Sequence, residues 1–474
     1  MRSPSRFLRP LIATVAVACV VAACAGKKPA TLAAAPPPVT ITEASVRGHM
    51  EFLASDAMQG RGSGTLDEWR AAAYIGSEMR RWGIEPLGDN GGYVKVVDTG
   101  RLTATAPPML VAGDLTLTYG REMLVQSINN GAVSGPLFRY TPGAKVPDGA
   151  FVFVPDGAAP DNAALANAAG TLTVETSAIR AQWAAAGMRL PVAQAGGGGR
   201  GGGAAPVAVV RIILDKASHA MIAGMADGTK IDFRCATAPG RTYNALGQLK
   251  GSDPRQSAQV ILLTAHLDHL GVRGAGPDTI YNGADDDASG STAVMELAEA
   301  IAKGPRPKRT VMFAWFGSEE AGGFGAADFL KNPPVPLKQM TANLEFEMIG
   351  RSDPKVPEHA LWLTGYRCSD LGAELARQGA KLVDDPHPEQ SFFTRSDNIQ
   401  LAYDGIIAHT VSSFNLHKEY HTPADDLAHI HFAHMTDSIR SMYAPVLWLA
   451  NSTFVPSWVA DGRPVRGQRK DCTK

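Results

Sequence analysis

Four segments rich in apolar residues in the second half of the chain predict buried strands, at 260–263, 310–316, 343–349 and 405–411. The first of them is continuously apolar, which is typical of a strand that is buried on both faces of a parallel sheet. Between the first two runs, residues 289–303 repeat apolar side chains at helical spacing before Gly304-Pro305. Strands that alternate with helices predict an α/β fold, with a doubly wound, mostly parallel sheet and helices on both faces.

The first half of the chain has a different pattern of apolar and polar residues. Thr65-Leu66-Asp67-Glu68 is a capping box, which predicts a helix that stops near Gly83. After it, short Val-rich segments alternate with Gly, Pro and Ala. We therefore expect a smaller, strand-rich domain at 110–240, inserted into a main domain formed by 41–109 and 241–460. A helix containing Pro445 follows from residue 436, and 461–474 are expected to be a flexible tail.

The N-terminus has the pattern of a targeting segment. Basic residues precede a short apolar stretch at 11–20, and Val21-Ala22-Ala23-Cys24 follows. This resembles the signal peptide of bacterial lipoproteins (1–24), which implies export and an envelope protein held in a membrane by lipidated Cys24, facing the periplasm or in the outer membrane. An ordinary secretory signal with a chance Cys is the alternative. Residues 25–40 are rich in Ala and Pro and predict an extended tether.

The nearly equal numbers of basic and acidic residues argue against one class of protein. Lys and Arg number 45 and Asp and Glu 46. The net charge of −1 argues against a nucleic-acid-binding protein, which would show a basic excess. Five cysteines are present, and if Cys24 is lipidated and Cys19 removed, three remain: Cys235, Cys368 and Cys472. One disulfide is possible, with its pair left open. No C-x-x-C pattern occurs, which disfavours a thiolate zinc site.

Potential metal ligands follow the predicted strands. In an open α/β sheet, ligands bind beyond the carboxyl ends of the strands. The polar segments at those ends and in nearby loops are His266-Leu267-Asp268-His269, Asp285-Asp286-Asp287, Glu319-Glu320, Glu345 with Glu347, and Tyr420-His421. Imidazoles and carboxylates without thiolates suit zinc at a catalytic site. The excess of carboxylates favours two ions, because one carboxylate can bridge them.

These segments, in this order, resemble the M28 peptidases, the dinuclear-zinc aminopeptidase type. The segments that carry the resemblance are His266-Leu267-Asp268, Gly283 to Gly290, Glu319-Glu320, Glu347-Met348-Ile349-Gly350 and Tyr420-His421-Thr422. Leu53-Ala54-Ser55-Asp56 with Gly60-Arg61, Asn244-Ala245-Leu246-Gly247 with Gly251-Ser252, and Ser396-Asp397 are also similar to family signatures. The insertion at 110–240 resembles a degenerate protease-associated domain.

The resemblance implies a role for each matching residue. His266 and Glu347 are expected on one zinc ion, Glu320 and His421 on the other, and Asp286 between them. Asp268 is expected to fix the His266 ring by accepting its other N–H. The resemblance further implies Glu319 as general base and Tyr420 as donor to the oxyanion. The family commonly has Asp where this chain has Glu347, which leaves Glu345 as a lesser candidate for that ligand.

The function implied is a zinc-dependent aminopeptidase that removes N-terminal residues from peptides with a free N-terminus. Three alternatives remain: a carboxypeptidase, another amidohydrolase on the same fold, or a noncatalytic envelope lipoprotein that binds a partner. A carboxypeptidase would need a basic residue in its pocket, and Arg351 and Arg395 are candidates. The chain contains neither G-x-S-x-G nor H-E-x-x-H, which disfavours a serine hydrolase and a one-zinc metalloprotease of that type.

Overall fold

The structure is a computed structural model, and it describes residues 41–128, 131–180, 209–273, 277–467 and 472. The predicted signal peptide (1–24) and tether (25–40) lie outside the described residues, as does part of the predicted tail. None of the helices in the described ranges combines the length and the apolar character needed to cross a membrane.

The main sheet has nine strands in the order β1-β11-β15-β12-β16-β19-β17-β18, with β2 also paired to β11. Its strands are β1 (Glu85–Pro86), β2 (Val94–Ala104), β11 (Thr237–Leu249), β12 (Val260–His266), β15 (Thr310–Phe316), β16 (Met340–Phe346), β17 (Leu361–Leu363), β18 (Leu382–Asp384) and β19 (Ala408–Ser412). The central strands β15, β12, β16 and β19 run parallel to one another, whereas β11 and β17 pair antiparallel with β15 and β19.

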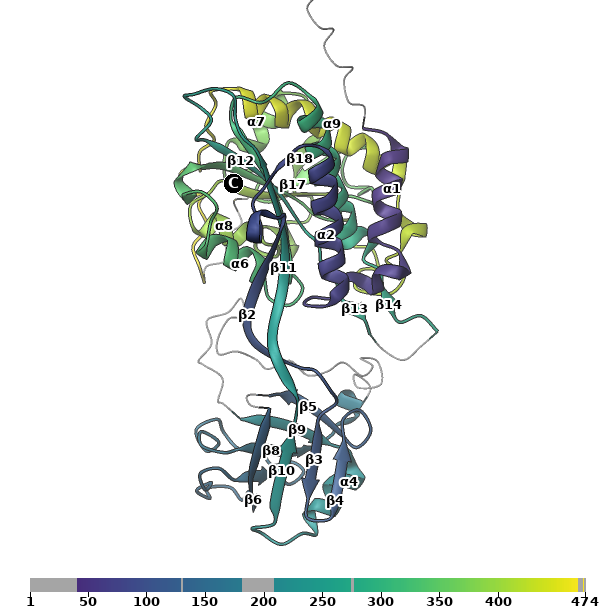
Figure 1. Ribbon diagram of the computed structural model, residues 1–474, viewed down its shortest axis with the longest axis vertical. Coiled ribbons are helices and arrows are strands. Elements are labelled where there is room, and N and C mark those ends of the chain that lie inside the picture. The colour runs from purple at the N-terminus through teal and green to yellow at the C-terminus, as the bar shows by residue number, and fades with distance from the viewer. Residues whose placement is uncertain (1–40, 129–130, 181–208, 274–276, 468–471, 473–474) are drawn as a thin grey trace, which may run out of the picture. The chain divides into compact units, whose positions relative to one another are not determined.

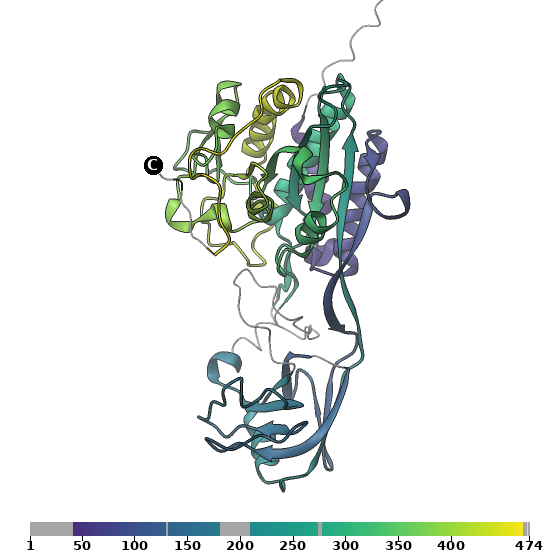
Figure 2. The same ribbon diagram turned by 90° about the vertical axis from the view of Figure 1, so that its left-hand side faces the viewer.

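Helices cover both faces of this sheet (Figures 1 and 2). One face packs on α1 (Glu43–Leu53), α2 (Leu66–Arg81), α5 (Gly290–Lys303), α7 (Leu371–Arg377) and α9 (Phe432–Asn451). The other face packs on α6 (Phe324–Lys331) and α8 (Asn398–Tyr403). Successive residues of β15 alternate between the two cores, so that Phe313 joins the first and Met312 the second. The predicted doubly wound α/β fold is therefore confirmed.

The central elements lie close to their predicted positions. Strand β15 has the predicted bounds, and the predicted strand at 343–349 ends early, at Phe346. The reason lies at Met348, whose φ is +52° and whose N–H donates to Asp287 Oδ1. The chain therefore turns at Met348, and Glu347, whose N–H still donates to the Val411 carbonyl of β19 at 3.1 Å, lies at the carboxyl end of β16.

Residues 109–234 form a second sheet of eight strands, in the order β4-β3-β10-β6-β7-β8-β9-β5. Its elements are β3 (Met109–Ala112), β4 (Leu115–Thr118), β5 (Met123–Ser127), β6 (Ala132–Arg139), β7 (Phe151–Phe153), β8 (Gly170–Val174), β9 (Val210–Leu214) and β10 (Lys230–Arg234), with helix α4 (Lys216–Ala223). This sheet buries an apolar core of its own, which includes Leu110, Phe151 and Phe233. The chain enters through β2 and returns through β11, which pair antiparallel.

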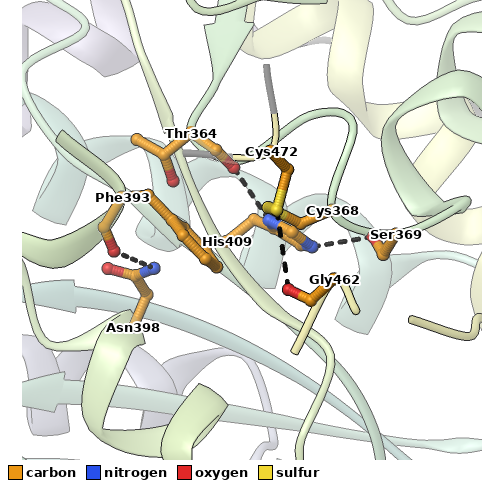
Figure 3. The surroundings of a disulfide bond; sticks show 8 residues. All are labelled: Thr364, Cys368, Ser369, Phe393, Asn398, His409, Gly462 and Cys472. Atoms are coloured by element: carbon orange, nitrogen blue, oxygen red, sulfur yellow. Dashed lines mark hydrogen bonds between the residues drawn. A yellow bond between two sulfur atoms is a disulfide. The ribbon is translucent and has the colours of Figure 1, made fainter. Parts of the chain in front are cut away.

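A disulfide joins Cys368 to Cys472 (Figure 3). Cys235 is a buried free thiol. The bond closes a separation of 104 residues and attaches the predicted tail to the loop after β17. Beside it lies fully buried His409, whose Nδ1 is 2.8 Å from the Thr364 carbonyl oxygen and whose Nε2 is 2.7 Å from Ser369 Oγ. The pair that the sequence left open is therefore Cys368–Cys472.

Candidate metal centre and active site

The carboxyl ends of β12, β15 and β16 bring the predicted ligands to one edge of the sheet. His266 is the last residue of β12, Glu320 follows β15, and Glu347 follows β16. Asp286 reaches the same place from the loop before α5, within a short helical turn, Ala284–Ser289. Parallel strands end at one edge, so residues 20 to 80 positions apart in sequence meet there without a special loop.

Two groups of potential ligand atoms share Asp286. His266, Asp286 and Glu347 form the first, and their ligand atoms all lie within 4.8 Å of one another. His266 Nε2 is 3.1 Å from Asp286 Oδ1. Burial alone would lower the pKa of His266, but Asp286 and other carboxylates around it raise the pKa well above its usual value. The first group is therefore a buried centre with an excess of negative charge.

The second group consists of His269, Asp286 and Glu320, whose ligand atoms also lie within 4.8 Å of one another. His421 joins it, with Nε2 at 3.1 Å from both Asp286 Oδ2 and Glu320 Oε1. Burial opposes a charge on His421, yet hydrogen bonding to Asp286 and the contact with Glu320 raise its pKa to about 10. The structure thus brings together all five predicted ligands and adds His269, which the family resemblance did not assign.

The residues fit a pair of cations. Among the described residues, His266 Nε2, His269 Nδ1 and Glu320 Oε1 are buried without a hydrogen-bond partner, although each lies beside another polar atom of the two groups. Buried polar atoms normally pair, so atoms that converge without hydrogen-bond alignment indicate a ligand between them. Imidazole and carboxylate donors suit zinc, and the shared carboxylate of Asp286 lies where it could bridge two ions.

Only the middle residue of the three adjacent acids faces both groups. Asp285 Oδ1 accepts a hydrogen bond from Gly350 N, and Asp287 Oδ1 accepts from Met348 N. The backbone of the loop is itself held by Asp425, whose carboxylate accepts from the N–H groups of Asp285 and Asp286 at 2.9 and 3.1 Å. Asp285 and Asp287 therefore shape the loop, and Asp286 is left to face both groups.

The side chain of Asp268 does not make the hydrogen bond to His266 that we expected. His266 Nδ1 lies 3.1 Å from the backbone carbonyl of Asp268 and 3.8 Å from its carboxylate. The carboxylate instead accepts from Ser63 Oγ at 2.5 Å and from the N–H of Glu319 at 2.9 Å. The expected hydrogen bond from His266 to the Asp268 side chain is therefore wrong, because that side chain is engaged by Ser63 and by the turn that carries Glu319.

Arg61 joins the loops around the centre. Its side chain is 1% exposed and donates to four backbone carbonyls, at 2.5 to 3.0 Å. The acceptors are Leu53, Leu267, Asn282 and Gly283. One guanidinium thus ties α1 to the loop after β12 and to the start of the Asp286 loop, a network that depends on residues about 200 positions apart.

A cavity of about 310 Å³ opens onto the two groups. Glu319, Tyr420 and Arg395 line it, together with an apolar wall that contains Met348, Trp362, Phe392 and Phe414. Burial and the nearby acids raise the pKa of Tyr420, which keeps its phenol protonated as a hydrogen-bond donor. Of the two candidate basic residues, Arg395 lines the cavity, whereas Arg351 pairs with Glu419 at 3.2 Å.

Glu345, the lesser candidate ligand, lies outside both groups. Its Oε2 accepts a hydrogen bond from Asn398 N at 2.5 Å, on the side of the sheet covered by α8. Burial raises the pKa of Glu345 to about 8. The geometry therefore favours Glu347 over Glu345 as a ligand.

Known proteins resemble this chain in sequence and in fold. Residues 244–444 match the sequence model of Peptidase family M28. Leupeptin-inactivating enzyme 1 of Streptomyces exfoliatus is 33% identical over 144 residues, which cover 29% of this chain and 30% of that protein. An aminopeptidase of Pseudomonas aeruginosa is 37% identical over 110 residues, 23% of this chain and 18% of that protein. The chain thus spans less than a third of either relative.

A solved structure extends the likeness beyond the matched segment. BSAP, a zinc aminopeptidase from Bacillus subtilis, superposes with a TM-score of 0.54 at 17% identity, over 91% of this chain and 99% of that one. At that identity the likeness concerns the fold. Residues 244–444 thus resemble the M28 peptidases in sequence, and the chain has the fold of a zinc aminopeptidase.

Proposed function

We propose that the protein is a zinc-dependent exopeptidase that removes N-terminal residues from peptides. One observation carries the proposal: two groups of imidazoles and carboxylates share Asp286, which lines a cavity together with Glu319 and Tyr420. The match of residues 244–444 to Peptidase family M28 supports the same reading.

In this proposal, His266 and Glu347 would hold one zinc ion and Glu320 and His421 the other, with Asp286 shared by the two groups. Zinc held by these ligands would supply Lewis acidity, which can polarise a substrate carbonyl and lower the pKa of a bound water toward about 7. Glu319 takes the proton of the attacking water at its carboxylate and returns it to the leaving amine. The Tyr420 hydroxyl donates a hydrogen bond to the carbonyl oxygen as negative charge develops on it.

The test compares dipeptides with free and N-acetylated amino groups, with and without a chelator and added zinc. Cleavage of the free-amine peptide alone, lost on chelation and restored by zinc, is the expected result. Cleavage of the acetylated peptide would reject the aminopeptidase. No cleavage of either peptide, by protein shown to contain two zinc ions, would place the substrate outside peptides with a free N-terminus.

A carboxypeptidase is the second candidate, and Arg395 favours it. Among the described residues that line the cavity, Arg395 is the one Lys or Arg side chain. A guanidinium is the usual partner of a peptide's terminal carboxylate. Under this alternative, a C-terminal amide would abolish cleavage, whereas an aminopeptidase would tolerate it. Arg395→Gln would then raise KM for the free acid.

We also propose that the chain is exported as a lipoprotein anchored in the cell envelope through Cys24. The basic start, the short apolar stretch and Val21-Ala22-Ala23-Cys24 support this proposal. Replacing Cys24 by Ala should move the protein from the membrane to the soluble fraction. Continued membrane association of that variant would refute lipid anchoring at Cys24.

The insertion at 110–240 is proposed to be a protease-associated-like domain. Its separate eight-stranded sheet and apolar core support an independent folding unit. Replacing it by a short linker should leave hydrolysis of dipeptides within about threefold and change the hydrolysis of long peptides. Equal losses for both substrates would contradict a role that depends on substrate length.

A further inference from the structure

We infer that His269 is a sixth protein ligand of the metal centre and that it makes the two metal positions unequal. The inference rests on the zinc centre proposed above. His269 Nδ1 lies 3.0 Å from Glu320 Oε1 and 3.8 Å from Asp286 Oδ2, within the second group of ligand atoms.

The spacing around the second position is that of ligands sharing one ion. His421 Nε2 lies 3.1 Å from Asp286 Oδ2 and 3.1 Å from Glu320 Oε1, on the same two oxygens that face His269. Donor atoms about 2.1 Å from a tetrahedral zinc ion lie about 3.4 Å from one another. The four distances of 3.0 to 3.8 Å bracket that value.

The contact between His269 and Glu320 lacks hydrogen-bond alignment. Among the described residues, both His269 Nδ1 and Glu320 Oε1 are buried without a hydrogen-bond partner. A histidine that merely oriented Glu320 would point an N–H bond at the oxygen, and the two atoms would then form a good hydrogen bond at 3.0 Å. Because His269 Nδ1 and Glu320 Oε1 approach each other without that alignment, they are well placed to bind one cation together.

The ring of His269 is held in place by its surroundings. His269 is 1% exposed, and its ring lies against the backbone of Gly283, where a Cβ atom would come within 2.5 Å of the ring. The backbone N–H of His269 donates to the carbonyl of Arg61 at 3.0 Å. These contacts fix the imidazole of His269 beside Glu320 and Asp286.

The consequence is an unequal pair of positions. Four protein donors surround the second position: His269, Asp286, Glu320 and His421. Three surround the first: His266, Asp286 and Glu347. Sites closed by four protein ligands are typical of tightly held zinc, whereas three leave a position for water or substrate. We therefore place the reacting water nearer His266 and Glu347, and expect the second ion to be the more tightly held.

Metal binding, measured apart from activity, tests the inference. The metal-free chain is titrated with Zn²⁺ against a competing chelator, for wild type, His269→Ala and His269→Asn. Asn places an amide near the position of Nδ1 and can still donate a hydrogen bond to Glu320, but it is a poor zinc ligand. His219→Asn, a buried histidine on α4 with no place in either group, controls for the loss of an imidazole. Circular dichroism of the metal-free proteins checks their folding.

Wild type and His219→Asn should bind two zinc ions. Both His269 variants should lose about 100-fold or more in affinity for the tighter ion, beyond what loss of a supporting hydrogen bond costs. Co²⁺ at that position should then show weaker visible absorption, as its coordination changes. Affinity of His269→Asn within about 10-fold of wild type would overturn the inference and leave the proposed function standing. Failure of the wild type to bind zinc would reject the proposed centre itself.

Discussion

The carboxylate of Asp268 accepts a 2.9 Å hydrogen bond from the backbone N–H of Glu319. Because His266 uses the Asp268 carbonyl instead, the side chain of Asp268 acts on the proposed base rather than on a metal ligand. We predict that Asp268→Ala lowers kcat about 10- to 100-fold and still binds two zinc ions. Steady-state kinetics and zinc analysis on the same preparation test this.

Asp268→Asn is the matched control for that prediction. Its amide oxygen can accept from Glu319 N while its NH₂ group donates to Ser63 Oγ, so kcat should recover to within about threefold of wild type. Loss of zinc from Asp268→Ala would show instead that Asp268 acts through His266.

The second prediction concerns Glu319. Its carboxylate lines the cavity beside both groups of ligands, and a general base contributes about 10²- to 10⁴-fold to a rate. Glu319→Gln should therefore lower kcat by that factor while KM and zinc content stay near the wild-type values. Glu299→Gln, a change on the outer part of α5, is the control and should retain full activity. Turnover by Glu319→Gln near the wild-type rate would show that Glu319 is not the general base.

Local patterns predicted the fold and most of the site. Continuous apolar runs identify buried strands, and β15 has the predicted bounds because all seven of its residues are buried. His266 and Glu320 could be found because each comes soon after such a run, and Glu347 because it lies toward the end of the predicted strand at 343–349. His269 could have been found in the same way, since it lies three residues after His266 at the same strand end.

Other features depend on contacts that no local pattern contains. Glu68 was expected to complete a capping box, yet its carboxylate accepts from Thr242 Oγ1 and Ser318 N, residues about 170 and 250 positions away. The pair Cys368–Cys472 was one of three that the cysteines allow. The apolar wall of the cavity likewise joins Trp362 to Phe414 only through the tertiary fold.

Arg61 leads to a third prediction, on stability. Replacing it by Ala would remove a donor from four buried carbonyls. The Gly283 carbonyl would still accept from the N–H of Ala288 at 3.2 Å, but each carbonyl left unsatisfied costs about 1–3 kcal/mol. Lys offers a single ammonium in place of the guanidinium fork and cannot replace it. Both variants should unfold at markedly lower urea concentration than wild type and bind zinc more weakly. If Arg61→Lys were as stable as wild type, the guanidinium group would not be required.

The disulfide leads to a fourth prediction. A cross-link between residues 104 positions apart restricts the unfolded chain, and removing such a bond costs about 2–5 kcal/mol. Cys368→Ser with Cys472→Ser should lower the midpoint of urea unfolding, and a reductant should have the same effect on wild type but none on the double variant. Cys235→Ser is the control for thiol loss outside the bond. A double variant as stable as wild type would show that the cross-link adds nothing.

A fifth prediction concerns His409, the buried neighbour of the disulfide. Burial, only partly offset by hydrogen bonding to the Thr364 carbonyl, lowers the pKa of His409 to about 4, from 6.5 in an exposed chain. Between pH 4 and pH 6.5, His409 is protonated in the unfolded chain but not in the folded protein. The free energy of unfolding therefore rises with pH over this range. The contribution of the neutral His409 to the free energy of unfolding is fully present above pH 6.5. It is lost as the pH falls toward 4, and the total loss is about 3 kcal/mol.

Urea unfolding of wild type and His409→Gln from pH 7.5 to pH 4.5 isolates this contribution. Gln retains an amide for Ser369 but does not titrate, so the stability of the variant should fall less steeply with acid than that of wild type. His431→Gln, at an exposed histidine, controls for imidazole loss. Because the carboxylates of the metal centre titrate in every variant alike, their effect cancels in the difference between the curves. Parallel curves for wild type and His409→Gln would show that His409 takes up its proton in the folded state as readily as in the unfolded chain.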